Sequence, residues 1–287
     1  MEQITRVGPA GWSYKDWEGF VYPPQPGPKF DALAYLANFF DTIEINSTFY
    51  RPPSESAAKS WIGRVAHNPK FKFTAKLNRV FTHERGTATQ KDETEFRSGI
   101  DCLSDATLLG ALLMQFPWSF RNTQENREHL VSLMERFGEY PLVIEVRHSS
   151  WNQPAVLDWL TEKDVGFCNI DQPLFHHSIQ PSQVATSPVG YIRLHGRNYE
   201  NWFSENARPS DRYDYLYSLD ELEPWVDRIK VLSSQARETY VIANNHYLGQ
   251  AAVNAIDIQA LLKGDKVRAP AVLAEKYPRL REIVIPE

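Results

Sequence analysis

Polar and ionisable residues alternate with apolar residues in several short segments of the sequence. In residues 42–47, 71–76, 142–147 and 190–195, most apolar side chains stand two positions apart. Side chains of a β-strand point alternately to its two faces, so each segment would have one polar face. In a barrel of parallel strands the apolar face meets the helices, and the polar face points inward. The predicted inward set is Glu44, Asn46, Lys76, Glu145, Arg147, Arg193 and His195.

Further polar residues stand at the ends of two other strand-like segments. Asp171 follows residues 165–170, and Asn244, Asn245 and His246 close the segment that begins at residue 240. The carboxyl ends of parallel strands meet at one face of a barrel, where active sites of this architecture lie. We therefore expect these residues at the same rim as the inward set.

This combination of charges predicts both anion binding and proton transfer. Unpaired charges are costly to bury, so the acids and arginines need ion pairs, water or a bound ligand. A purely structural charge network is the alternative. Glu145 and His195 are predicted to transfer protons, and Asp171 is a further catalytic candidate. Groups predicted to bind phosphate oxygens are Arg51, Lys76, Arg147 and Arg193, and those predicted to orient substrate or water are Glu44, Asn46, Asn245 and His246.

Aromatic residues follow the same strand-like segments. The chain contains eight Trp, 13 Tyr and 15 Phe, and aromatic faces around a polar pocket suit stacking on bases or sugars. Taken singly, each Trp is more often an anchor of its loop. The aromatic residues at these positions are Trp12, Tyr14, Trp17, Trp118, Trp151, Tyr199, Trp202 and Phe203, of which Trp12, Tyr14, Trp151 and Trp202 are predicted to bind substrate.

A divalent metal is possible, but the sequence contains no specific metal motif. Zinc or manganese would use carboxylate oxygens and imidazole nitrogens, yet no HExxH spacing occurs. His148 falls in the outward phase of its strand, and His176 and His177 are expected in a solvated loop. No organic cofactor is implied. The candidate ligands are Glu44, Glu145, His148, Asp171, His195 and His246.

The elements that would position these residues form a TIM (β/α)8 barrel. Strands are predicted over residues 6–8, 42–47, 71–75, 109–116, 142–147, 165–170, 190–195 and 240–244. Helical patterns separate most of them, and eight such units close a barrel. A helix is predicted over residues 30–40, capping boxes at Asn122 with Glu125 and at Ser218 with Glu221, a first-turn Pro154, and a stop at Gly264. Residues 171–188 and 196–217 are predicted to be long functional loops, the second a possible lid.

Composition is consistent with one soluble domain over residues 1–287. Hydrophobic residues make up 42% and charged residues 23%, and the net charge is -5. That charge argues against nonspecific attraction to nucleic acid or membrane, although a local basic groove remains possible. No signal peptide, membrane span or CxxC pair is visible, so we expect a cytoplasmic protein with two free thiols, and no protein partner is implied.

The motifs GPAGWSYKDW, FDTIEINSTFYRPP, FKFTAK, THERG, LLMQFPWSF, IEVRHSSW, YIRLHGRN and ANNH resemble the YecE-like family, or domain of unknown function seventy-two. The resemblance extends from Gly8 to about Leu262 and implies a TIM barrel whose biochemical function is not established. Where the family often has Phe-Asn-Asn-His, this chain has Ala at position 243. The family motifs add Thr48, Tyr50, Arg51, Gln115 and His148 to the candidate site, with Tyr50, Arg51 and Gln115 in substrate binding and His148 in catalysis.

Three functions remain open on these residues. The first is an enzyme with acid–base chemistry, hydrolase-like or lyase-like, that acts on a phosphate-bearing sugar or nucleic-acid ligand. The second is a noncatalytic protein that binds nucleic acid or a metabolite. The third is a glycoside hydrolase with Glu44 and Glu145 as its carboxylate pair. The resemblance of the fold to the xylose-isomerase-like superfamily favours anionic substrates, but only by analogy.

Overall fold

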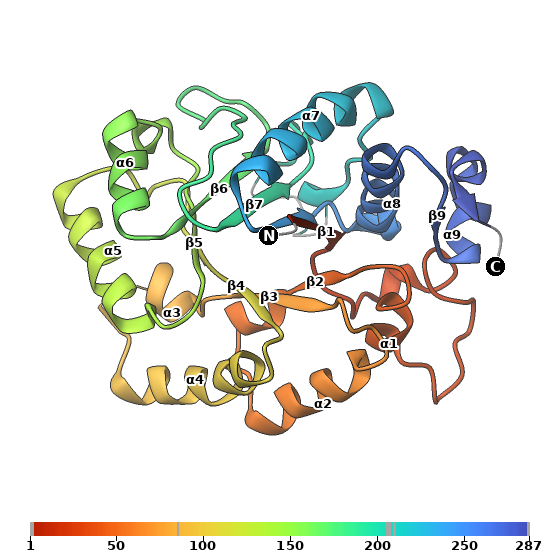
Figure 1. Cartoon of the computed structure of the whole chain (residues 1–287), viewed down its shortest axis with the longest axis horizontal. Coiled ribbons are helices and arrows are strands. Elements are labelled where there is room, and N and C mark those ends of the chain that lie inside the picture. The colour runs from red at the N-terminus through yellow and green to blue at the C-terminus, as the bar shows by residue number, and fades with distance from the viewer. Residues whose placement is uncertain (1–2, 85, 205–207, 209–210, 286–287) are drawn as a thin grey trace.

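A computed structural model describes residues 3–84, 86–204, 208 and 211–285. Eight parallel strands form the barrel, with helices around it (Figure 1), as the sequence predicted. In chain order each strand pairs with the next from β2 to β8, and β8 also pairs with β1. The strands are β1 (Ile4–Pro9), β2 (Thr42–Ile45), β3 (Lys72–Lys76), β4 (Leu109–Gln115), β5 (Leu142–Glu145), β6 (Gly166–Asp171), β7 (Val189–Leu194) and β8 (Glu238–Ala243).

The barrel closes between β1 and β2 through a short contact rather than a full ladder. Ala10 and Glu44 form an isolated parallel bridge, and the Gly11 amide donates to the Glu44 carbonyl at 2.8 Å. Gly8 permits this approach, because a Cβ atom there would lie 1.9 Å from the carbonyl oxygen of Thr42. The close contact brings the Glu44 strand beside the first strand of the chain.

Helices cover the outside of the barrel, with an additional two-stranded sheet of β9 (Val267–Arg268) and β10 (Val284–Ile285) near the C-terminal end. The α-helices are α1 (Ala32–Leu36), α2 (Glu55–Val65), α3 (Arg79–Thr82), α4 (Gln90–Asp105), α5 (Gln124–Phe137), α6 (Pro154–Glu162), α7 (Leu219–Gln235), α8 (Gln250–Lys263) and α9 (Ala271–Lys276). The 3-10 helices are η1 (Lys15–Trp17), η2 (Asn46–Phe49), η3 (Ser149–Trp151), η4 (Asp211–Tyr213), η5 (Tyr247–Gly249) and η6 (Pro278–Glu282). No helix in the described residues is long and apolar enough to cross a membrane.

Most of the predicted helix signals are confirmed. Ser218 and Glu221 form a capping box at α7, Pro154 begins α6, and Gly264 ends α8 in the left-handed conformation with φ +66°. The capping box predicted at Asn122 is wrong by one residue. Thr123 is the cap of α5, because the Asn122 side chain instead donates to the Ser150 carbonyl at 3.0 Å.

Other element boundaries are shorter than predicted. Helix α1 covers Ala32–Leu36 instead of residues 30–40, because Asp31 caps its first turn and accepts from the Ala34 amide. Strands β2, β5 and β7 end at residues 45, 145 and 194, so Asn46, Arg147 and His195 follow their strands. Residues 172–188 contain no helix, as expected for a long loop. Residues 205–207 and 209–210 of the second predicted loop lie outside the described residues.

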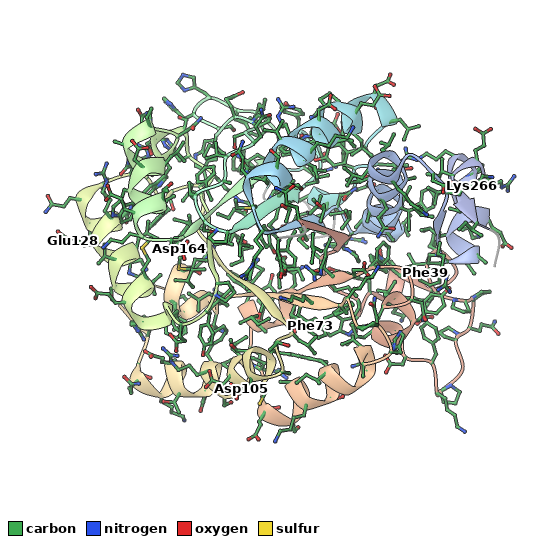
Figure 2. The ribbon with its side chains drawn as sticks, viewed as in Figure 1. Phe39, Phe73, Asp105, Glu128, Asp164 and Lys266 are labelled. Atoms are coloured by element: carbon green, nitrogen blue, oxygen red, sulfur yellow. The ribbon has the colours of Figure 1, made fainter. Side chains whose placement is uncertain are left out.

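Side chains of each strand divide between the barrel interior and the helix layer as the alternation predicted. Figure 2 shows Phe73 in the interior of the molecule, and Glu128 and Lys266 at its periphery. Phe73 is fully buried, whereas its neighbour Thr74 bonds with Tyr191 inside the barrel. Both cysteines are free; Cys168 is buried and Cys102 is partly exposed. The polar face of the strands therefore lines the barrel interior.

Candidate active site at the barrel mouth

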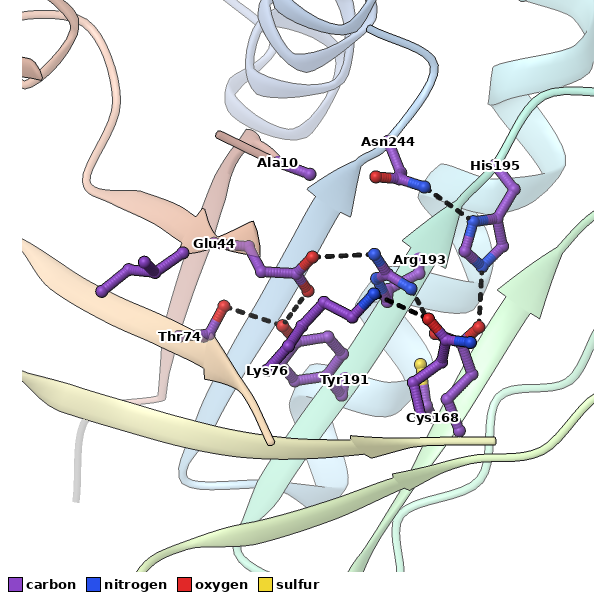
Figure 3. A network of polar contacts seen from close by, with 12 residues as sticks. Ala10, Glu44, Thr74, Lys76, Cys168, Tyr191, Arg193, His195 and Asn244 are labelled. Carbon is purple, nitrogen blue, oxygen red and sulfur yellow. Dashed lines mark hydrogen bonds and ion pairs between the residues drawn. The ribbon is translucent and has the colours of Figure 1, made fainter. Parts of the chain in front are cut away.

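The Arg193 guanidinium joins two carboxylates at the centre of the site. Its Nη2 donates to Glu44 Oε1 at 2.7 Å, and its Nη1 donates to Glu145 Oε2 at 2.5 Å. All three side chains are almost fully buried, with side-chain exposures of 1%, 0% and 0%. Figure 3 shows Arg193 beside Glu44, with the Tyr191 hydroxyl between that carboxylate and Thr74. Since a buried charge needs partners, this arrangement ties β2, β5 and β7 together.

Glu145 is the most heavily bonded acid of the site. Its Oε1 accepts from Arg147 Nε at 3.1 Å, from Arg147 Nη2 at 2.9 Å and from the His195 ring at 3.1 Å. Burial alone would raise the pKa of Glu145, but Arg193, His195 and Arg147 together hold that pKa well below its usual range. Glu145 is therefore an ionised acceptor and a weak base.

His195 bonds to both Glu145 and Asn244. Figure 3 shows the Asn244 amide beside the His195 ring. Burial lowers the pKa of His195 to about 3, despite the opposing effect of Glu145. A neutral imidazole has one donor and one acceptor nitrogen. Since a carboxylate only accepts, Nε2 donates to Glu145, and Nδ1 accepts from the Asn244 amide at 3.0 Å. Both ring nitrogens are thus engaged within the protein.

Lys76 is the one cation of this group that is not paired with an acid among the described residues. Its Nζ donates to Gln115 Oε1 at 2.7 Å and lies 4.2 Å from the centre of the Phe49 ring. Burial, followed by the positive charge of Arg193, lowers the pKa of Lys76 to about 7. Lys76 can therefore exist as a free amine near neutral pH.

A pocket of about 220 Å³ lies over this charge cluster. Arg147 forms part of its floor, with its guanidinium 5.5 Å from the Trp202 ring, and Arg212 contributes a second cation. Nε of Arg212 is buried without a hydrogen-bond partner among the described residues. The pocket is lined by His83, Gln115, Pro117, Trp118, Arg147, Trp202, Phe203, Arg212 and Tyr213. Cations and aromatic walls thus meet in one small space.

A second pocket, of about 190 Å³, lies at the ends of β1 and β2. Trp12, Tyr14 and Asn46 contribute to its walls. The Tyr14 ring stacks on His246 with 4.5 Å between ring centres, and its hydroxyl donates to the Ala10 carbonyl at 2.5 Å. His246 also contacts Tyr213, which lines the cationic pocket, with 5.0 Å between ring centres, so the two pockets are neighbours.

Four predicted site residues form their hydrogen bonds and ion pairs outside the Glu145 cluster. Asp171 binds Arg197 at 2.6 and 2.9 Å and accepts from Tyr217 and Trp225. The Asn245 amide donates to the Tyr215 carbonyl and to Asn254, the Trp151 indole donates to the Phe120 carbonyl at 2.7 Å, and His148 Nδ1 accepts from the Ser150 amide. These bonds fix the loops behind the strands, and none of them joins the Glu145 cluster.

Tyr50 and Arg51 lie on the surface beyond η2. Tyr50 is 71% exposed, and Arg51 is also exposed. Thr48, from the same motif, donates its hydroxyl to the carbonyl of Lys76 at 2.7 Å. The EINSTFYR motif thus supports the backbone of the buried lysine while its last two residues face solvent.

The candidate metal ligands are not gathered into one centre. Among residues 3–84, 86–204, 208 and 211–285, no three His, Cys, Asp or Glu side chains come together in a metal-binding arrangement. Glu44 and Glu145 hold guanidinium groups, Asp171 holds Arg197, and His246 stacks on Tyr14. The donors proposed from the sequence therefore do not fit a shared metal site.

Several pocket residues were not identified as site residues from the sequence. His83 belongs to the THERG motif and follows the short helix α3. Strand alternation therefore could not predict the direction of its side chain. Arg212 and Tyr213, which also line the pocket, lie in the aromatic-rich loop after β7. The long loop was the available signal for Arg212, since loops after barrel strands often carry site residues.

Comparison with known proteins agrees with the family resemblance and the fold. The family model for protein of unknown function DUF72 matches residues 6–278. The UPF0759 protein YunF of Bacillus subtilis (strain 168) is 26% identical over 270 residues, which cover 89% of this chain and 94% of that protein. The crystal structure of a DUF72 family protein from Thermotoga maritima is 34% identical, with a TM-score of 0.80 and coverage of 91% and 99%.

A DUF72 family protein from Enterococcus faecalis is also similar in structure, with 26% identity, a TM-score of 0.79 and coverage of 91% of this chain and 96% of that one. The family-model match spans nearly the whole sequence, and the solved structures share the barrel. The chain belongs to the DUF72 family, as its motifs predicted.

Proposed function

We propose that this protein is an enzyme that acts on a small phosphate-bearing ligand in the pocket over the charge cluster. The observation that carries this proposal is the meeting of Arg147 and Arg212 in one pocket of about 220 Å³. Guanidinium groups bind phosphate oxygens through charge-assisted hydrogen bonds. The volume suits a small metabolite better than a polymer.

Arg147 is suited to anchor the anion. Its Nε and Nη2 are held by Glu145, which fixes the plane of the guanidinium, and its side chain keeps 14% exposure. Within the described part of the chain no hydrogen bond uses its Nη1. A preorganised guanidinium loses little conformational entropy when it binds phosphate.

We assign Glu145 and His195 to positioning rather than to direct proton transfer. Glu145 is saturated by Arg147, Arg193 and His195, and both nitrogens of His195 are engaged. Removing Glu145 would release the Arg147 guanidinium that lines the pocket, and removing His195 would take away one of the hydrogen bonds that position Glu145. The sequence predicted that Glu145 and His195 transfer protons. We now propose that Glu145 holds the arginines in place and that His195 positions Glu145.

Noncatalytic polyanion binding has less support from this geometry. Such binding favours a continuous positive groove, whereas Glu44 and Glu145 lie directly among the arginines. Glycoside hydrolysis by the same two carboxylates also has less support, because the Arg193 guanidinium bridges them. A glycosidase pair needs one free acid and one free nucleophile or base.

Binding of inorganic phosphate, measured by isothermal titration calorimetry, tests the anion site. Arg147→Met should weaken binding by roughly 10- to 100-fold, because it removes a charged hydrogen-bond donor. The matched control is Arg281→Met in η6, which removes an exposed arginine away from the pocket. Equal affinity in the wild type and Arg147→Met would contradict the assignment of the pocket.

Turnover can be followed by ³¹P NMR with a panel of triose, pentose and hexose phosphates. Glu145→Gln and His195→Ala should both reduce any conversion that the wild type shows, because the arginines lose their fixed positions. Phosphate binding that survives Glu145→Gln, with no conversion of any sugar phosphate by the wild type, would support a noncatalytic binding protein instead.

A further inference from the structure

The charges at the barrel mouth balance without Lys76. The two carboxylates of Glu44 and Glu145 pair with the two guanidinium groups of Arg193 and Arg147. A protonated Lys76 would add a fifth charge to a buried layer in which both acids are already neutralised. A neutral amine adds none, so the electrostatic balance favours Lys76 without its extra proton.

On balance the surroundings of Nζ also favour the neutral amine, because burial outweighs the two nearby acids. Arg193 and Arg147 oppose the ammonium form, whereas Glu44 and Glu145 favour it, and burial is the largest effect. His83 also faces this group, and burial followed by Lys76 and Arg147 lowers the pKa of His83 to about 4, so His83 is neutral near pH 7. The Phe49 ring covers one side of the amine.

Lys76 lies beside residues that line the cationic pocket. Its hydrogen-bond partner Gln115 lines the pocket, as do His83 and Arg147, and the lysine keeps 8% exposure. Figure 3 shows the Lys76 side chain extending toward Arg193. A ligand held by Arg147 would therefore place its neighbouring atoms near a buried primary amine.

We propose that Lys76 is the nucleophile of this site and forms a Schiff base with the carbonyl carbon of a phosphorylated aldehyde or ketone. The proposal rests on the proposed function, because the phosphate group would be held by the pocket arginines. A free amine is a nucleophile, whereas an ammonium ion is not. No carboxylate is paired with Lys76 to keep it protonated in the described structure.

The step balances without an external reagent. The Nζ lone pair attacks the carbonyl carbon to form a C–N bond, and the C–O π electrons move to oxygen, which is protonated. The hydroxyl group then leaves, and the two hydrogens of the amine depart with the carbonyl oxygen as one water molecule. The product is an imine that links Lys76 to the ligand.

Reductive trapping tests this chemistry. Wild-type protein is incubated at pH 7 with glyceraldehyde 3-phosphate and sodium cyanoborohydride, and the adducts are located by peptide mass spectrometry. With a pKa of about 7, roughly half of the Lys76 amine should be deprotonated at pH 7, whereas an ordinary lysine is deprotonated to less than ~0.1%. Lys76 should therefore be labelled on the order of 10³ times faster than a surface lysine such as Lys59.

The control variants separate the site from general lysine reactivity. Lys76→Arg should lose the fast label, whereas Lys59→Arg, which alters an exposed side chain on α2, should keep it. Labelling of Lys76 in the wild type should rise around pH 7 and level off above pH 8. The wild-type pattern alone decides the question even if Lys76→Arg does not fold.

The possible failures are distinguishable. If inorganic phosphate binds but Lys76 is labelled no faster than Lys59, the nucleophile proposal is overturned and the phosphate site stands. If phosphate does not bind, yet unphosphorylated glyceraldehyde labels Lys76 selectively with the same pH midpoint, the reactive amine is supported and the phosphate-bearing ligand is overturned.

Discussion

The two ends of the barrel each contain an ionic cluster, partly exposed at the amino-terminal end and more deeply buried at the mouth, and their compositions differ. At the amino-terminal end, Glu238 accepts from Arg6 at 2.9 Å, from Lys72 at 3.0 Å and from Tyr240 at 2.5 Å. Here the lysine is paired directly with the acid. At the mouth, Lys76 has Gln115 as its partner, and both acids are taken by arginines.

The surroundings of the two ionic clusters differ as well. The Tyr240 hydroxyl fills the space beside Gly110, where a Cβ atom would lie 2.2 Å from it. The mouth cluster instead borders a pocket of about 220 Å³. A lysine paired with an acid closes the barrel floor, whereas a lysine without one, next to a pocket, is available for chemistry. This contrast fits the general division of barrels into a stabilising floor and a functional mouth.

The largest expected effect on stability comes from removing the arginine at the mouth, compared with removing the arginine at the amino-terminal end. Arg193→Met leaves two buried carboxylates without their shared partner and should lower the free energy of unfolding by about 3–5 kcal/mol. Arg6→Met should lower the free energy of unfolding by less, because Glu238 still accepts hydrogen bonds from Lys72 and Tyr240. Urea denaturation of both variants measures the difference, and an equal or larger loss in Arg6→Met would contradict the contrast.

The pH dependence of stability sharpens the contrast between the lysines. Lys76 has a pKa of about 7 in the folded protein and an ordinary value near 10.4 when unfolded, so the unfolded chain binds more protons between these values. Stability should therefore rise with pH through this window, by about 1.4 kcal/mol per pH unit. We expect this rise between pH 7 and 9 to be absent in Lys76→Met.

Lys59→Met is the control for that experiment. Its hydrogen bond with Glu55 raises the pKa of Lys59, so the contribution of that group stays constant between pH 7 and 9. Unfolding curves at several pH values for the wild type and both variants provide the test. A wild type and a Lys76→Met variant that change in parallel with pH would show that Lys76 remains protonated.

The smallest effect is expected for the tyrosine at the barrel floor. Tyr240→Phe removes one hydrogen bond to Glu238 but leaves both cations in place, so it should cost about 1 kcal/mol. Thermal or urea unfolding measures this loss. A loss as large as that of Arg193→Met would mean that the floor cluster depends on the hydroxyl more than on its cations.

The sequence by itself determined the barrel and the inward face of its strands. Alternation with period two is a local property, so it identified Glu44, Glu145 and Arg193 as inward residues before any partner was known. The family motifs agreed with the same fold. The helix caps at Ser218 and Gly264 were also predictable, because capping depends on a few neighbouring residues.

Only the tertiary structure decided which charges meet. Glu44 and Arg193 are separated by 149 positions, and no local pattern reports that bond. Asp171 occupies a strand end as predicted, yet it pairs with Arg197, while Arg212 reaches the pocket from a long loop. The altered pKa of Lys76 likewise depends on burial and on charges from other strands, because desolvation and Coulomb interactions act through space rather than along the chain.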